Sequence, residues 1–95
     1  MNKEIIDKLR ELKPILKEKF GIEEFAVFGS VARGEDTKDS DIDIAILKSS
    51  KKSLFLRLRA IEFLKSRLNK DVDMGYVEGM KTFIKNRIKK DFIYV

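Results

Sequence analysis

The chain has 95 residues and a net charge of +5, and it contains neither cysteine nor histidine. This length provides for one small domain, which we expect to span residues 1–95. Disulfides, thiolate zinc sites and imidazole acid–base chemistry are excluded, so any catalysis would depend on carboxylates, hydroxyls, Lys, Arg or a metal ion.

The first half of the chain predicts a helix, a strand and a polar loop. Apolar residues recur three or four positions apart and mark an amphipathic helix: Ile5, Leu9, Leu12, Leu16 and Phe20. Pro14 should kink or split this helix, and Gly21 should end it. Residues 24–28 follow as a short strand, and residues 31–39 as a polar loop that begins with a helical turn.

The second half predicts two strands and two helices. Residues 41–47 predict a strand, because their isoleucines recur at every second position and so share one face. A polar connection covers residues 49–53, and residues 71–76 form a third strand. A second helix is marked by a leucine-rich periodicity: Leu54, Leu58, Ile61, Leu64 and Leu68. A last helix is marked by Met80, Ile84 and Ile88, and residues 93–95 form an extended tail. The element order is therefore α-β-β-α-β-α, an α/β (α+β) chain.

Strand directions would bring three segments together. A helix joins the second and third strands, which favours parallel pairing and places Asp71 and Asp73 beside Asp41 and Asp43. If the first strand runs antiparallel to the second, Gly29 lies at the same end. We therefore predict a small mixed β-sheet, flanked by helices, with a site at one edge.

The Asp-x-Asp pair predicts a magnesium site. Asp41 and Asp43 project from the same face of a strand, and close carboxylates repel one another unless a cation binds. With a third carboxylate from the next strand, they could hold two Mg²⁺ ions, which prefer oxygen ligands. Asp73 and Asp71 are both candidates for that third position. Alone, an Asp-x-Asp is more often a strand end that meets solvent.

Residues around this pair are suited to a triphosphate. Gly29 would let the backbone approach a phosphate closely, and Ser30 offers its hydroxyl and N–H. Arg33 offers a planar guanidinium to the same group, and Ser40 could support the aspartate loop through a local hydrogen bond. Each signal is weak alone, since Gly-Ser is a common turn, but the combination predicts transfer of part of a nucleoside triphosphate.

At these residues the chain resembles the minimal nucleotidyltransferase family of the DNA polymerase β-like superfamily. The matching strings are FGSVARG at residues 28–34 and SDIDIAIL at residues 40–47, and the similarity extends over almost the whole chain. The resemblance implies the polymerase β-like nucleotidyltransferase fold, Mg²⁺-ATP as donor and release of pyrophosphate. It implies phosphate binding by Gly29 and Ser30 and metal ligation by Asp41 and Asp43. Asp73 matches the third carboxylate, which helps to ligate the metal and accepts the hydroxyl proton.

The resemblance also implies a partner. Members of this branch are commonly antitoxins of a helical HEPN ribonuclease toxin, and they add AMP to a tyrosine of that toxin. The leading hypothesis is therefore an AMP-transferring antitoxin that forms a complex with a HEPN-type toxin protein.

Two alternatives remain. One is an antitoxin that acts by binding alone, and the other is a nucleotidyltransferase acting on RNA or a small molecule. The basic residues of the later helices are better explained as solvated faces than as a nucleic-acid surface. Phe55, Phe63 and Phe83 could form a partner surface or belong to the core. A charge-free run of only residues 25–32 and a charged N-terminus predict a cytoplasmic protein without a membrane partner.

Overall fold

The protein is described by a computed structural model that covers residues 2–95. It begins with α1 (Lys3–Phe20), where the Asn2 side chain accepts a hydrogen bond from the Ile5 N–H at 3.2 Å. Gly21 ends the helix in the left-handed conformation that glycine tolerates, as predicted. The predicted split at Pro14 is wrong, because α1 runs through it without a break. A proline inside a helix costs about 3 kcal/mol through a lost backbone bond and a steric clash, and buried side chains on both sides of Pro14 hold the two halves in place.

Two strands with a short helix between them come next. β1 (Ile22–Phe28) begins two residues earlier than predicted, and β2 (Ile42–Ser49) extends further than predicted, to residue 49. Between them, α2 (Gly29–Arg33) starts directly at the end of β1, so the predicted helical turn is present. β1 and β2 pair antiparallel, with Phe28 opposite Asp43.

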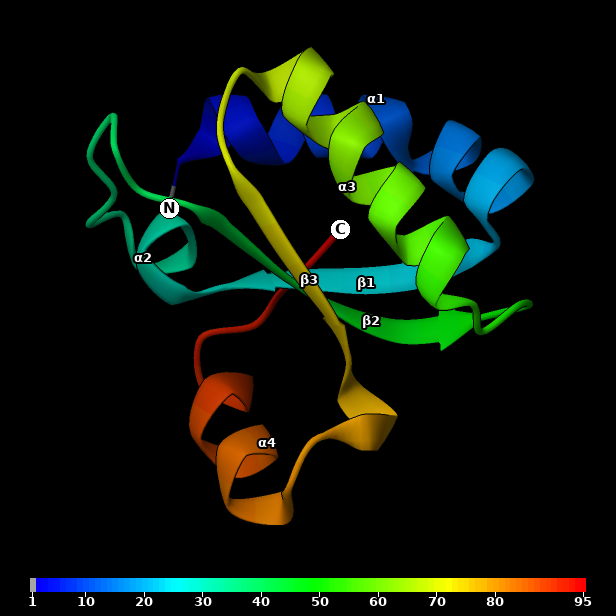
Figure 1. Ribbon diagram of the computed structural model, residues 1–95. Helices are drawn as coiled ribbons and strands as arrows, with labels where there is room; N and C mark the ends of the chain where they lie inside the picture. The colour runs from blue at the N-terminus through cyan, green and yellow to red at the C-terminus, as the bar shows by residue number, and fades with distance from the viewer. Residues whose placement is uncertain (1) are drawn as a thin grey trace.

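The rest of the chain adds one strand to each edge of the sheet. α3 (Leu54–Leu68) crosses over to β3 (Val72–Tyr76), which pairs in parallel with β2. A short 3₁₀ turn, η1 (Val77–Gly79), leads to α4 (Thr82–Lys89), and β4 (Ile93–Tyr94) pairs antiparallel with β1. The four strands are ordered β3-β2-β1-β4 (Figure 1). The mixed sheet and both strand directions are confirmed, whereas the predicted element order omitted α2 and β4.

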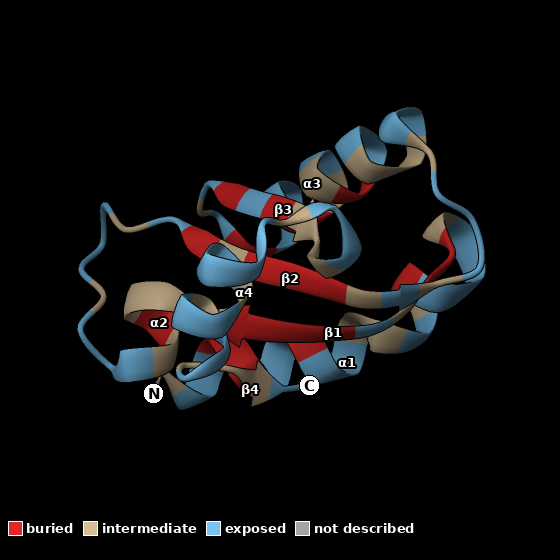
Figure 2. Cartoon of the chain, turned by 90° about the horizontal axis from the view of Figure 1, so that it is seen from below, coloured by how far each residue is buried: buried red, intermediate tan, exposed pale blue. Residues whose placement is uncertain are grey.

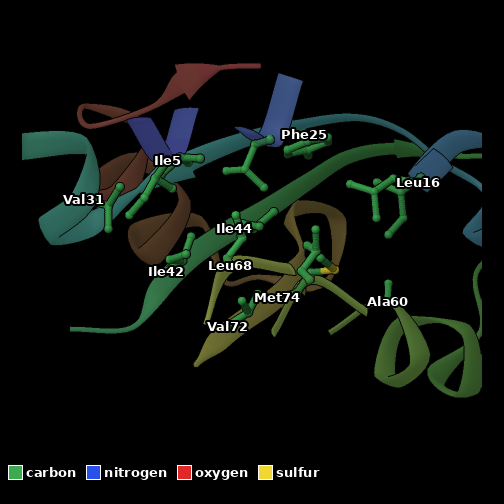
Figure 3. Close-up of a cluster of buried hydrophobic side chains, with 14 of the residues drawn as sticks. Ile5, Leu16, Phe25, Val31, Ile42, Ile44, Ala60, Leu68, Val72 and Met74 are labelled. Carbon is green, nitrogen blue, oxygen red and sulfur yellow. The ribbon is translucent and has the colours of Figure 1, made fainter. Parts of the chain in front are cut away.

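The core lies between the sheet and one layer of helices. α1 and α3 cover one face of the sheet, and α4 lies on the opposite side (Figures 1 and 2). Buried side chains from the strands meet those of α1 and α3 in this core (Figure 3). They include Ile42, Ile44 and Ile46 of β2, and no polar or charged residue of the described chain is buried.

The aromatic residues of uncertain role are now placed. Phe63 packs against the core, with its ring 5.5 Å from that of Phe20. Phe55 and Phe83 are each 68% exposed. No helix within residues 2–95 is long and apolar enough to span a membrane.

Candidate functional site

The acidic site is built on the face of the sheet that turns away from α1 and α3. Ile42 and Ile44 are buried on the core side of β2, so the residue between them, Asp43, projects to the other side. Its register partner in β3 is Asp73. Hydrogen-bonded strands lie about 4.8 Å apart, so the predicted convergence of carboxylates from two neighbouring strands holds for this pair.

Asp43 lies in an electrostatically unfavourable environment. Partial burial raises the pKa of its carboxyl above the usual value, and the negative charges of Asp73 and Asp41 raise this pKa further. The positive charge of Arg33 acts in the opposite direction. A bound cation would favour the ionised form of Asp43, so this environment suits a metal ligand.

The two other aspartates have different surroundings. Asp41 is exposed and lies just before β2, close enough for its charge to act on Asp43. Asp71 lies just before β3, where its carboxylate forms an ion pair with Lys65 of α3 at 3.2 Å. Its carbonyl accepts a hydrogen bond from the Ile42 N–H at 2.9 Å. The geometry therefore brings Asp73, rather than Asp71, next to Asp43.

Gly29 contacts the Asp43 carboxylate directly. Its φ of +75° belongs to the left-handed region, and a Cβ atom built there would lie 2.3 Å from Asp43 Oδ2. Only glycine therefore fits both the backbone conformation and the available space. The sequence alone explains this glycine by the close approach of a phosphate. The structure adds a second reason for glycine at this position, the packing of the Asp43 side chain against it. Ser30 follows Gly29 as the second residue of α2.

Arg33 and Ser40 both form hydrogen bonds through their side chains. Arg33 Nε donates to Glu35 Oε2 at 2.9 Å, and Arg33 Nη1 donates to Asp91 Oδ2 at 2.8 Å. Both carboxylates raise the pKa of Arg33, that of Glu35 most strongly. Ser40 Oγ accepts the Thr37 N–H at 2.9 Å, so the expected local support of the aspartate loop is present. Their predicted contacts with a nucleotide remain predictions.

The chemistry of the carboxylates fits Mg²⁺, although residues 2–95 contain no group of three His, Cys, Asp or Glu side chains close enough to form a ready-made metal site. Mg²⁺ is usually bound through one or two carboxylates together with substrate phosphates and water. The Asp43–Asp73 pair, with Asp41 nearby, meets that smaller requirement. An open hollow of about 420 Å³ beside Ser40 and Asp41 extends toward the end of α3 and does not include Asp43 or Asp73.

Asp91 is the residue of this region that the sequence analysis missed. It lies 58 positions from Arg33, in the turn between α4 and β4. No spacing or motif in the sequence joins the two residues, and only the pairing of β4 with β1 brings them together.

Residues 9–95 match the family described as the nucleotidyltransferase domain. The chain belongs to this family. A candidate protein adenylyltransferase of Methanocaldococcus jannaschii is 39% identical over 97% of this chain and 95% of its own length. Protein adenylyltransferase MntA of Thermococcus cleftensis is 35% identical over 87% of this chain and 84% of its own length.

Several solved structures share the fold. The structure of a candidate minimal nucleotidyltransferase superposes with a TM-score of 0.78 at 28% identity, covering 98% of this chain and 95% of the other. A toxin–antitoxin structure with AMP-PNP superposes with a TM-score of 0.74 at 25% identity, covering 99% of this chain and 72% of the other. The predictions of family, fold and enzyme class are thus confirmed: this nucleotidyltransferase has the mixed sheet of its minimal relatives.

Proposed function

We propose that this nucleotidyltransferase transfers AMP from Mg²⁺-ATP to a hydroxyl of a partner protein, a tyrosine of a HEPN-type toxin, and so acts as an antitoxin. The observation that carries the proposal is the register that places Asp43 beside Asp73, with Gly29 against the Asp43 carboxylate. The adenylyltransferase names of the relatives and the AMP-PNP in the similar toxin–antitoxin structure support it. We place the activity in the cytoplasm, where ATP is available.

In this reaction, the acceptor oxygen attacks the α-phosphorus of ATP. A bond forms between that oxygen and phosphorus, the bond from the α-phosphorus to the bridging oxygen breaks, and pyrophosphate leaves. Asp73 accepts the proton of the hydroxyl. Gly29 and Ser30 hold the phosphates through backbone N–H groups and the Ser30 hydroxyl. Asp41, Asp43 and Asp73 would hold magnesium, which, when bound, offsets the charge of the triphosphate and lowers the pKa of the attacking hydroxyl.

Labelling of the partner tests this proposal. The protein is incubated with Mg²⁺, ATP labelled at the α-phosphate, and a candidate HEPN-type partner protein. We expect Asp43→Ala and Asp73→Ala to abolish labelling, and Asp39→Ala, an equal loss of charge in an exposed loop, to retain it. Undiminished labelling by Asp43→Ala would reject the site.

Neutralisation by binding alone is the second candidate. It is favoured by large apolar side chains that α3 exposes near its start, where Leu54 is 61%, Phe55 68% and Leu58 52% exposed. Such side chains are suited to a stable protein contact. Growth of cells that carry the toxin and the Asp41→Ala/Asp43→Ala variant separates the two candidates: rescue indicates binding alone, and continued toxicity indicates AMP transfer.

A further inference from the structure

Arg33 is held by two carboxylates, and one of them comes from the opposite end of the chain. Glu35 lies two residues away in an exposed loop, and its side chain is 66% exposed. Asp91 bonds to the other side of the guanidinium and is only 27% exposed. Asp91 is thus the less exposed of the two partners, and its own side chain has less freedom to move.

The backbone around Asp91 is fixed at several points. The Asp91 N–H donates to the Ile88 carbonyl at 2.9 Å, which closes the turn after α4. The next ring, that of Phe92, lies 6.1 Å from the ring of Phe28. Phe28 directly precedes Gly29 and is paired with Asp43. The turn that carries Asp91 therefore packs on the same β1 end from which the predicted phosphate-binding segment starts.

The two ion pairs leave part of the guanidinium free. An Arg side chain has five N–H donors, and here the Nε donor binds Glu35 while one donor on Nη1 binds Asp91. The remaining donors include both of Nη2. These can bind a phosphate oxygen while the two carboxylates stay in place, so the pairs orient Arg33 without occupying all of its donors.

We propose that Asp91 is a positioning residue: it holds the Arg33 guanidinium toward the Gly29–Ser30 segment and thereby strengthens binding of the nucleotide polyphosphate. The inference rests on the proposed function, since it assumes that a nucleotide occupies this segment. It gives the turn between α4 and β4 a part in nucleotide binding.

The sign of an affinity change tests this role. Removing a negative charge beside a polyphosphate site strengthens anion binding through the general field, whereas loss of a positioning contact weakens it. We expect Asp91→Asn to bind ATP about tenfold more weakly in calorimetric titration, a size typical for a residue that orients a ligand-binding group. Asp39→Asn makes the same charge change in the exposed loop and should bind no more weakly than the unmodified protein. Equal or tighter binding by Asp91→Asn would overturn the inference.

A double-variant cycle separates positioning from a merely structural role. If Asp91 acts through Arg33, then Arg33→Gln and Arg33→Gln/Asp91→Asn should have the same ATP affinity. Asp91→Glu should restore part of the lost affinity. Additive losses in the cycle, or a fall in urea stability without a change in affinity, would reject the role. If the unmodified protein does not bind ATP at all, the proposed function itself fails, and this outcome is distinct from equal binding by protein and variant.

Discussion

The two faces of β2 make opposite contributions to the molecule. On one face, Ile42, Ile44 and Ile46 are buried against α1 and α3. On the other face, partial burial and the nearby charges of Asp73 and Asp41 raise the pKa of the Asp43 carboxyl. Side chains one position apart thus have different roles. The isoleucines stabilise the fold, while the aspartate carries the proposed chemistry at a cost in stability.

This separation has a simple energetic basis. Burial of an isoleucine side chain contributes about 1.5–3 kcal/mol, whereas a partly buried carboxylate beside like charges destabilises the folded state until a cation or proton arrives. Substitutions on the core face should therefore affect stability first. Substitutions on the acidic face should affect activity first and leave stability unchanged or improved.

The largest expected effect is the loss of activity in Asp43→Asn. A carboxylate that holds the metal contributes several kcal/mol to the transition state, so AMP transfer should fall by about a thousandfold. Stability at neutral pH should rise, because the substitution removes a charge that is disfavoured by partial burial and by repulsion from Asp73 and Asp41. Label transfer and urea unfolding measure the two quantities. A variant that loses both activity and stability would break the proposed separation of the faces.

The matching change on the core face is Ile44→Ala. Ile44 is 1% exposed, and truncation of such a residue leaves a cavity that costs about 2–5 kcal/mol. Ile44→Val is the graded control and should cost about 0.5–1.5 kcal/mol. Urea unfolding gives both values, and transfer by the folded fraction should stay close to normal. A large loss of activity per folded molecule would show that the two faces are coupled.

Gly29→Ala tests the close contact between Gly29 and the Asp43 carboxylate. Positive φ costs a side-chain-bearing residue about 1–3 kcal/mol, and the new Cβ would collide with Asp43 Oδ2. Placing the same substitution in an Asp43→Ala background removes the collision and leaves only the cost of the backbone conformation. We therefore expect unfolding experiments to show a smaller loss there. Gly79→Ala, with no atom within 4 Å of its Cβ, is the matched control and should have little effect. Equal losses in both backgrounds would show that Asp43 moves aside freely.

Period-two alternation explains why much of this site could be predicted from the sequence. Alternating isoleucines assign Asp43 to the face opposite the core, and the helix between β2 and β3 favours parallel pairing with the strand that carries Asp73. Gly29 was identified from its position between a strand and a serine. Short-range patterns of this kind depend only on neighbouring residues, so the elements that they predict are present in the structure.

The features that could not be predicted depend on contacts between distant segments. β4 has two residues, too few to show the alternation of a strand in the sequence. It joins the sheet only by pairing with β1. Asp91 reaches Arg33 only because of that pairing. Pro14 remains helical because residues beyond its own turn are packed against the sheet. Coordinates were also needed to show that Asp73, rather than Asp71, lies beside Asp43, since this depends on the register of β2 and β3.

The smallest expected effect is the pH dependence that Asp43 adds to stability. Because the folded-state pKa of Asp43 is raised above its ordinary value of 3.8, the folded protein binds more protons than the unfolded chain between those two pKa values. The contribution of Asp43 to stability should therefore fall as pH rises through this window and level off above it. Asp43→Asn should remove that part of the slope. Urea unfolding with chelator from pH 4 to 7 measures the difference, and Mg²⁺ should restore stability to the unmodified protein more than to the variant. A difference that stays constant across the range would mean that neither partial burial nor the charges of Asp73 and Asp41 raise the pKa of Asp43. The acidic face would then lack the unfavourable electrostatics that set it apart from the core face.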